Sequence, residues 1–215
     1  MAKKSIISII DYEVGNLRSI TNSINKIGYK TKIISTPDDI LLSDYLILPG
    51  VGAFEKGMQG LKKNNMNDAI IEYAKRGKPL LGICLGAQIL LSKSEEFGIW
   101  KGLDLIPGRV VSFLSSIDNN SKQYYPIPQM GWNSVNFIDS EFEKSLKPYN
   151  AIELYFLHSY YMLPQNASDI AATTEYAGLE YCSIIKRQNT YGYQFHAEKS
   201  GEMGLKLLEL FCTLP

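Results

Sequence analysis

The sequence contains few cysteines. There are three among 215 residues, at positions 84, 182 and 212, and no two of them form a C-x-x-C pair. An odd number at such wide spacing argues against a disulfide framework and against a zinc site. Cys182 and Cys212 stand in apolar runs, where a free cysteine packs as a small buried side chain. Cys84 differs from both, because a glycine stands two residues away on each side of it.

The chain also lacks a net charge and a long apolar run. Its 22 basic residues balance 22 acidic ones, so no overall field attracts nucleic acid or an anionic membrane. No apolar stretch approaches the roughly 20 residues that cross a bilayer. The short run at 5–10 has no small-residue cleavage site and leads into Asp11, which favours a buried strand over a signal peptide. We therefore expect a soluble cytoplasmic protein that binds neither nucleic acid nor membrane.

Apolar runs and helical spacings alternate through the first half of the chain. We expect strands over 6–10, 31–35, 45–48 and 79–83, and helices over 14–27, 66–75 and 87–91. Gly28 and Gly77 mark the ends of the first two helices. A strand–helix alternation at this spacing predicts a parallel sheet with right-handed crossovers.

The second half contains more strands and one polar segment. We expect strands over 109–114, 134–138, 152–157, 170–174, 182–186 and 191–195, a last helix over 204–210, and a mobile loop over 118–123. No repeat or linker divides the chain, and 45% hydrophobic residues suffice for one sizeable core. The expected fold is a single α/β domain over 1–215, with a central mixed, mostly parallel sheet and helices on both faces.

The segment Gly82-Ile83-Cys84-Leu85-Gly86 follows an expected strand and precedes an expected helix. It is a cysteine version of the G-x-S-x-G nucleophile elbow, in which glycines permit a tight turn that exposes the nucleophile at the carboxyl end of the sheet. The positive end of the following helix favours the thiolate form. Taken alone, the motif is equally compatible with a buried cysteine beside incidental glycines.

A cysteine nucleophile needs a base, and the chain has two histidines. His196 ends an expected strand, and strand ends in an α/β sheet face the same edge as the elbow. Glu198 stands two residues on, where it can accept the other imidazole N–H and fix the tautomer. The alternative is a solvated surface pair. His158 stands among aromatic residues, which favours a packed, hydrogen-bonded histidine that shapes a substrate pocket.

Glycines also follow the expected strand at 45–48, in Pro49-Gly50-Val51-Gly52. Two glycines allow backbone N–H groups to point at one small oxygen, as a tetrahedral intermediate requires. No Lys-Ser or Lys-Thr follows, so the segment does not match a nucleotide triphosphate loop. A plain structural turn remains the alternative.

Together these segments resemble the class I, or triad-type, glutamine amidotransferases, and more narrowly the glutaminase subunits of imidazole glycerol phosphate synthases. The resemblance spans nearly the whole chain. The segments that carry it are Ile10-Asp11-Tyr12, Gly15 to Ser19, Pro49 to Phe54, Lys78 to Gln88, Gln129 to Asn133, Tyr155 to Tyr160 and Gln194 to Ser200. The elbow and the His-x-Glu segment are common to the class, whereas Asn-Leu-Arg-Ser and Met-Gly-Trp-Asn are typical of this subunit.

The resemblance implies a Cys84–His196–Glu198 triad that hydrolyses glutamine through a γ-glutamyl thioester, without cofactor or metal. It implies an oxyanion hole from the backbone at Gly50, Val51, Gly52 and Leu85. Glutamine would be held by residues of the pocket, namely Gln88, Glu96, His158, Ser159 and Tyr160. The partner would be a barrel-shaped cyclase subunit forming a heterodimer, and the residues facing it would be Asn16, Arg18, Trp132, Asn133 and Tyr155.

Two positions depart from the family pattern. Ala197 replaces the usual proline between the triad histidine and glutamate, which removes a fixed φ without touching a reacting group. Ala87 replaces a more common methionine, which we interpret as a packing change. Three alternatives stay open: a paralogue that supplies ammonia to another synthase, such as one that amidates surface sugars; a stand-alone cysteine hydrolase; and an inactive binding subunit.

Overall fold

The computed structural model describes residues 5–116, 125–138, 144 and 152–214. The strands are β1 (Ile6–Ile10), β2 (Lys30–Ile34), β3 (Tyr45–Leu48), β4 (Leu80–Ile83), β5 (Leu91–Ser94), β6 (Trp100–Lys101), β7 (Ile106–Ser112), β8 (Gln129–Ser134), β9 (Asn136–Phe137), β10 (Glu153–His158), β11 (Tyr160–Pro164), β12 (Ile170–Tyr176), β13 (Leu179–Arg187) and β14 (Thr190–Tyr193). The helices are α1 (Leu17–Lys26), α2 (Pro37–Leu42), α3 (Phe54–Lys63), α4 (Met66–Lys75), α5 (Leu85–Ile89) and α7 (Gly201–Cys212), with 3₁₀ turns η1 (Phe113–Ser115), η2 (Ala167–Asp169) and η3 (Ala197–Lys199). The loop expected over 118–123 lies outside the described residues.

The described strands form a 12-stranded mixed sheet and a separate two-stranded sheet, β10–β8. The long sheet runs in the order β2-β1-β3-β4-β14-β13-β11-β7-β5-β6, with β12 and β9 attached beyond β13. Strands β2, β1, β3, β4 and β14 are parallel to one another. Antiparallel pairing begins at β13. The expected α/β fold with a mixed central sheet is therefore confirmed, and its parallel part includes the strands that precede the elbow and His196.

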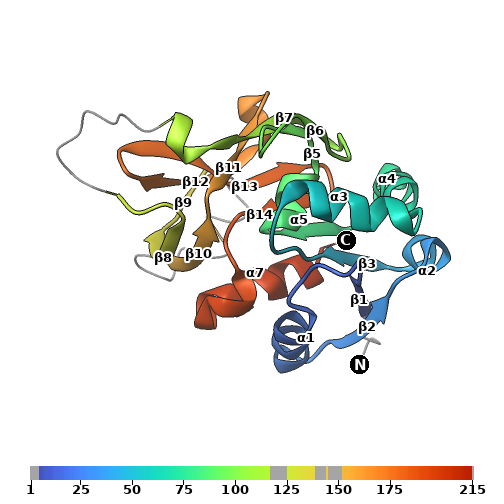
Figure 1. Ribbon diagram of the computed structural model, residues 1–215. Coiled ribbons are helices and arrows are strands. Elements are labelled where there is room, and N and C mark those ends of the chain that lie inside the picture. The colour runs from blue at the N-terminus through green and yellow to red at the C-terminus, as the bar shows by residue number, and fades with distance from the viewer. Residues whose placement is uncertain (1–4, 117–124, 139–143, 145–151, 215) are drawn as a thin grey trace.

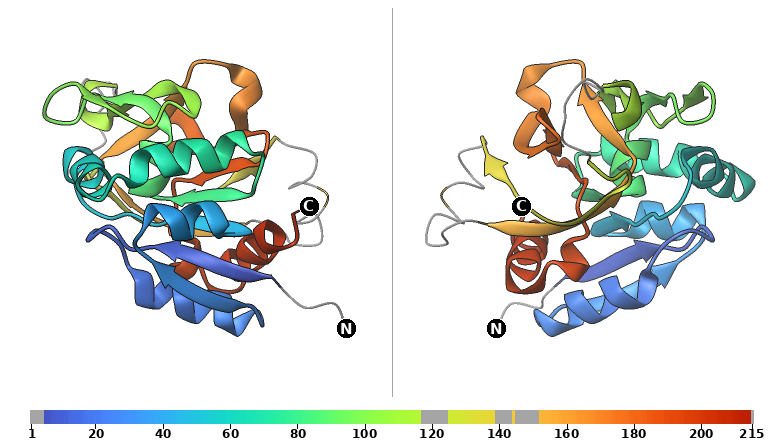
Figure 2. Two further views of the ribbon diagram at one scale, coloured as in Figure 1. Left: turned by 90° about the vertical axis from the view of Figure 1, so that its right-hand side faces the viewer. Right: turned by 60° about the vertical axis from the view of Figure 1, so that its left-hand side comes forward.

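Helices cover both faces of the parallel part (Figure 1). Helices α1 and α7 contact each other on one face, while α3 contacts α4 and α5 on the other. The views in Figure 2 show the blue α1 and the red α7 on the same side of the sheet. Successive strand residues alternate between the two cores: Ile9 belongs to the core under α1 and α7, and Ile10 to the core under α2 to α5. This alternation is the period-two geometry of a strand buried on both faces.

Several elements differ from the sequence expectation. Helix α3 was not expected, and its Gly57 and Gly60 lower helix propensity. Both glycines are there for close packing: a Cβ at Gly57 would lie 2.6 Å from Ile89 Cδ1, and one at Gly60 would lie 2.4 Å from the Tyr12 carbonyl oxygen. Tertiary contact therefore decides this helix. The helix expected over 87–91 is wrong at both ends, since α5 is Leu85–Ile89 and Leu91 already begins β5.

The strand expected over 134–138 is also wrong, because it is two strands in two sheets. Ser134 ends β8, which pairs with β10, whereas β9 pairs with β12. The strands β5, β6 and β11 and the helix α2 were not expected. Among the described residues, no helix is long and apolar enough to span a membrane.

Candidate active site

Adjacent parallel strands bring the chemically distinctive segments together. Strands β1, β3, β4 and β14 are neighbours and run in the same direction. Their carboxyl ends therefore meet at one edge of the sheet. The residues that follow these four ends are Tyr12, Gly50, Cys84 and His196. The topology therefore places the expected nucleophile, Cys84, and the expected base, His196, at the same edge of the sheet.

Cys84 occupies a strained elbow between β4 and α5. Its φ is +54° and its ψ is −110°, a backbone conformation that a residue with a side chain rarely adopts. Both flanking glycines are required by close approach of the backbone. A Cβ at Gly86 would lie 1.9 Å from the Leu48 carbonyl oxygen, and one at Gly82 would lie 2.6 Å from the Gly86 carbonyl oxygen. The elbow therefore holds Cys84 at the sheet edge by packing that no larger residue would allow.

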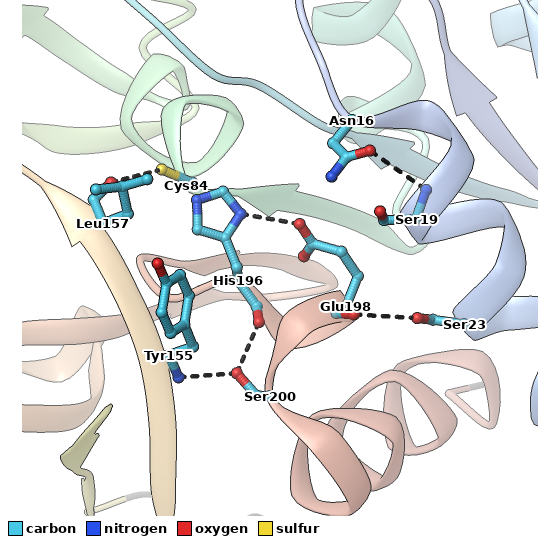
Figure 3. Close-up of polar contacts among 9 residues, drawn as sticks. All are labelled: Asn16, Ser19, Ser23, Cys84, Tyr155, Leu157, His196, Glu198 and Ser200. Carbon is cyan, nitrogen blue, oxygen red and sulfur yellow. Dashed lines mark hydrogen bonds and ion pairs between the residues drawn. The ribbon is translucent and has the colours of Figure 1, made fainter. Parts of the chain in front are cut away.

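The imidazole of His196 connects Cys84 to Glu198 (Figure 3). Its Nδ1 lies 2.9 Å from Glu198 Oε1, and both side chains are almost completely buried. Burial on its own would lower the pKa of His196, but hydrogen bonds with Cys84 and Glu198 and their negative charges outweigh it and raise the pKa to about 10. At neutral pH the ring is therefore an imidazolium that can stabilise a thiolate. The thiol of Cys84 also lies 3.9 Å from the Leu157 carbonyl oxygen.

Ser200 fixes the backbone around His196, a role that was not predicted. Its hydroxyl donates to the His196 carbonyl oxygen at 2.6 Å and accepts from the Tyr155 N–H at 2.9 Å. The His196 N–H in turn donates to the Tyr155 carbonyl oxygen at 2.9 Å. Strand β10 and the turn η3 are thereby joined on both sides of the base. A buried serine two residues after Glu198 is compatible with many roles, so only the fold reveals this one.

A cavity of about 240 Å³ opens beside Cys84. Its lining includes all five residues expected to hold glutamine, but it includes only three of the four expected oxyanion residues, since Gly50 is absent. Pro128 and Leu157 were not expected. The lining residues are Val51, Gly52, Cys84, Leu85, Gln88, Glu96, Pro128, Leu157, His158, Ser159, Tyr160 and His196. The volume falls below the roughly 300 Å³ at which cavities for drug-sized ligands begin, so it suits a molecule the size of an amino acid.

Two polar side chains in this cavity are held in place by the backbone. The Gln88 amide donates to the Tyr160 carbonyl oxygen at 2.8 Å. Glu96 accepts from the Phe54 N–H at 2.6 Å. Burial raises the pKa of Glu96, and the hydrogen bond from Phe54 opposes that rise. A fixed acidic side chain and a thiol in one small cavity match the ammonium group and the side-chain amide of glutamine.

His158 is packed rather than poised as a base. Its Nδ1 lies 2.9 Å from the Tyr160 carbonyl oxygen, and its ring is surrounded by Phe113, Phe156 and Tyr181. Burial lowers the pKa of His158 to about 3, with the Tyr160 hydrogen bond opposing and the charge of His196 adding to the effect. The ring is therefore neutral at physiological pH and shapes the cavity wall.

The glycine-rich segment after β3 has a definite orientation. The Leu85 N–H donates to the Gly50 carbonyl oxygen at 3.3 Å. In a trans peptide the N–H points away from the carbonyl oxygen, so the Val51 N–H is directed away from Leu85. Gly50 is required here, since a Cβ would lie 2.7 Å from both the Gly86 nitrogen and the Tyr12 hydroxyl. In this orientation the Leu85 donor is occupied by protein and not free for a substrate oxygen.

The turn that carries Ala197 is ordered without the usual proline. The Lys199 N–H donates to the His196 carbonyl at 3.0 Å, and the Ser200 N–H donates to the Ala197 carbonyl at 3.1 Å. Gly204 of α7 packs against the same carbonyl, where a Cβ would lie 1.9 Å away. These contacts supply the restraint that a proline ring would otherwise give. Ala87, the other departure from the family pattern, is fully buried against Gly82 and Gly192.

Four of the five residues expected to face a partner lie near the triad, at the start of α1 and on the strands β8 and β10. Trp132 and Tyr155 are cross-strand neighbours in the β8–β10 sheet, and the Tyr155 ring lies 6.5 Å from that of His196. Asn16 caps α1, which lies beside η3 because Ser23 donates to the Glu198 carbonyl oxygen at 3.4 Å. Arg18 is exposed on that helix.

Asn133 differs from the other expected partner residues. It pairs with the buried Leu154, so it lies on the face of the β8–β10 sheet opposite to Trp132. Its side chain accepts from the Gln129 amide at 2.8 Å. The structure therefore does not bring Asn133 to the Trp132 face.

Comparison with known proteins identifies the family of the chain. The model of the family "Glutamine amidotransferase class-I" matches residues 8–213. The chain belongs to the class I glutamine amidotransferases. Imidazole glycerol phosphate synthase subunit HisH 1 of Legionella pneumophila strain Paris is 45% identical over 218 residues, covering 98% of this chain and 100% of that protein. The HisH subunit of Chlorobaculum tepidum is 40% identical over 207 residues, covering 96% and 98%.

Solved structures support the fold of this amidotransferase. PurLQS from Thermotoga maritima superposes with a TM-score of 0.69 at 20% identity, covering 97% of this chain and 98% of that one. At this level of identity the likeness concerns the fold alone. The segments of this amidotransferase that lie far apart in sequence, at the ends of β3, β4 and β14, meet at one edge of that fold.

Single substitutions in the triad should lower kcat by different amounts. We expect His196→Asn to lower kcat for glutamine hydrolysis by roughly 10⁴-fold or more, and Glu198→Gln to retain roughly 10- to 100-fold more activity, because the glutamate only orients the base. His158→Asn, which removes a packed ring, should cost no more than about tenfold. Steady-state glutaminase assays check the ranking. Equal losses for His158→Asn and His196→Asn would show that the base is misassigned, and independent, multiplying losses for His196→Asn with Cys84→Ala would contradict a triad.

The pH dependence of the amidotransferase should reflect the raised pKa of His196. A thiolate–imidazolium pair is active only while the ring keeps its proton. Because the pKa of His196 is raised to about 10, kcat/KM should hold through pH 8 and fall as the pH rises through about 10. A pH–rate profile of the activated enzyme, with circular dichroism at each pH to verify folding, measures this limb. A decline centred near the ordinary histidine value of about 6.5 would contradict it.

Proposed function

We propose that the chain hydrolyses glutamine to glutamate and passes the ammonia to the cyclase subunit of imidazole glycerol phosphate synthase, in histidine biosynthesis. The observation that carries the proposal is the imidazole of His196, held between Glu198 and Cys84 at the mouth of a cavity of amino-acid size. The relatives at 40–45% identity over nearly the full chain are named as subunits of that synthase, which supports the choice of pathway.

The proposed reaction uses the triad in both halves. The Cys84 thiolate attacks the carboxamide carbon, and the imidazolium of His196 gives its proton to the departing nitrogen, so that ammonia leaves and a γ-glutamyl thioester remains. His196 then accepts a proton from water as that water attacks the thioester carbonyl. The carbon–sulfur bond breaks, glutamate is released, and the thiolate–imidazolium pair is restored. Glu198 holds the tautomer through Nδ1 in both halves.

The face of the β8–β10 sheet beside Cys84 is the proposed contact with the cyclase subunit. Met130 is 68% exposed, Trp132 is 52% exposed and Leu157 is 37% exposed, and the β8–β10 register pairs Met130 with Leu157 and Trp132 with Tyr155. These four apolar side chains lie on one face, since cross-strand neighbours and alternate residues share a side. An exposed patch of large apolar residues on a small sheet is typical of an interaction site. Its place next to His196 would let ammonia leave the cavity directly into the partner.

Trp132 should contribute a large share of the binding free energy of that contact. We expect Trp132→Ala to raise the Kd of the complex by about 30-fold, as truncation of a buried interface tryptophan does. Leu42→Ala is the matched control, because Leu42 is 80% exposed on α2. Titration calorimetry of each variant with the cyclase subunit gives both constants. Equal affinities for Trp132→Ala, Leu42→Ala and the unaltered chain would remove this face from the interface.

The function is tested by reconstitution. The purified chain, the cyclase subunit and its nucleotide ligand are mixed with glutamine, and glutamate and imidazole glycerol phosphate are measured together. Equal molar yields of both products support the proposal. Glutamine hydrolysis that needs no cyclase, or that only another ammonia-consuming synthase stimulates, would favour a stand-alone hydrolase or a paralogous subunit.

A further inference from the structure

We propose that Tyr12 is a positioning residue for the oxyanion-forming segment, the backbone at 49–52. Its hydroxyl anchors the Pro49 carbonyl, so that the next peptide, Gly50–Val51, can turn as a single unit. This inference rests on the proposed glutaminase function and assigns a role to a residue outside the substrate cavity, since Tyr12 is not among the residues that line it.

The contacts of Tyr12 with this segment are close and buried. Tyr12 stands two residues after the end of β1, is 0% exposed, and its hydroxyl donates to the Pro49 carbonyl oxygen. A Cβ on Gly50 would lie 2.7 Å from the same hydroxyl. The loop also passes close to Pro49, because a Cβ added at Gly15 would lie 3.1 Å from Pro49 Cγ. The loop after β1 therefore holds the Pro49 carbonyl through Tyr12 and passes beside the Pro49 ring at Gly15.

The anchor matters because of how a peptide turns. When the Gly50–Val51 peptide turns, ψ of Gly50 and φ of Val51 rotate in opposite senses. The turn is well defined only if the preceding peptide, Pro49–Gly50, stays in place. The Tyr12 hydroxyl fixes that preceding peptide through the Pro49 oxygen. Burial, with the charge of Cys84 adding to it, raises the pKa of Tyr12, so the hydroxyl keeps the proton that it donates. Without the anchor, the Val51 N–H would point toward the oxyanion position with less precise aim.

The placement of Tyr12 also connects this segment to the start of α1. Asn16, which caps α1, stands next to Gly15, where an added Cβ would meet the Pro49 ring. The loop that holds Pro49 is thus continuous with the helix end that we propose to face the partner. The effect of losing the hydroxyl should therefore appear mainly in the partner-stimulated reaction.

Tyr12→Phe tests the inference, with Tyr73→Phe as its control. Tyr73 is also 0% exposed, and its hydroxyl also donates to backbone carbonyls, those of Asp44 and Pro79, which precede β3 and β4 at the edge of the sheet opposite the site. We expect Tyr12→Phe to lower the partner-stimulated kcat by about 3- to 10-fold, the range of one neutral hydrogen bond, with KM within about twofold. Tyr73→Phe should lower the melting temperature by about as much as Tyr12→Phe does, but it should leave kcat unchanged.

The remaining outcomes each have a definite meaning. Synthesis from ammonium salt should be equal in both variants, which shows that the cyclase subunit is active, and equal Kd values by titration calorimetry show that both complexes form. An unchanged kcat for Tyr12→Phe, or a loss that Tyr73→Phe reproduces, would overturn the anchoring role while leaving the glutaminase proposal intact. Failure of the unaltered chain to hydrolyse glutamine with its partner would instead overturn the proposed function.

Discussion

Replacing Cys84 with alanine should abolish glutamine-dependent synthesis by the complex and leave synthesis from ammonium salt intact. The nucleophile has no substitute in the cavity, since the other two cysteines, Cys182 and Cys212, are buried elsewhere and do not line it. Loss of a triad nucleophile costs on the order of 10⁶ in kcat in a serine protease whose triad acts as a unit. Ammonia use, by contrast, is proposed to occur on the partner chain.

Paired assays of the Cys84→Ala complex decide this prediction. One assay supplies glutamine and the other supplies ammonium salt at a pH where free ammonia is present. Cys182→Ala is the matched control, because Cys182 is a buried thiol whose pKa is raised by burial, remote from the cavity. More than a trace of glutamine-dependent synthesis by Cys84→Ala would show that another group performs the attack.

The chain alone should be a poor glutaminase, and the ligand-loaded cyclase should stimulate it by about 10²- to 10³-fold. The reason is the orientation of the Gly50–Val51 peptide, whose carbonyl accepts from the Leu85 N–H. This contact occupies one candidate oxyanion donor and turns another, the Val51 N–H, away. Loss of one oxyanion donor costs on the order of 10²–10³ in rate. Turning this peptide would free Leu85 and direct the Val51 N–H inward, and partner binding would raise the population of that state.

Steady-state glutaminase rates of the chain alone, with cyclase, and with cyclase plus its nucleotide ligand measure the stimulation. Gly52→Ala provides a second test, because Gly52 has a φ of +95° and open space where a Cβ would lie. Its methyl group would meet no atom, so any change in activation would come from the backbone restriction alone. Full activity of the isolated chain would contradict control by the orientation of the Gly50–Val51 peptide. It would also remove most of the case for an obligate partner.

The parts of the site that follow from strand ends could be predicted from the sequence. The elbow, the glycine-rich turn and His-x-Glu each follow an apolar run, and parallel strands place such positions at one edge. The observed edge brings Gly50, Cys84 and His196 together as that argument requires. The packed state of His158 was also predictable, since four aromatic residues stand within five positions of it in the sequence.

Other features depend on contacts between distant segments, and no local pattern encodes them. Helix α3 forms although its two glycines disfavour it, because they allow close contact with Tyr12 and Ile89. Ser200 acquires its role only when β10 lies beside η3. The face on which Asn133 lies is set by the β8–β10 register, and a shift of one residue would reverse it. The orientation of the Gly50–Val51 peptide depends on a single hydrogen bond across 35 positions of sequence.

The proposed reaction requires Cys84 to form a γ-glutamyl thioester with glutamine. To detect it, the activated complex is mixed with glutamine and quenched in acid within the first turnovers, and peptide masses are determined. We expect a glutamyl group on the peptide that contains Cys84, removable by hydroxylamine and absent from Cys84→Ala. A glutamyl group on any other residue, or glutamine turnover by Cys84→Ala, would contradict it.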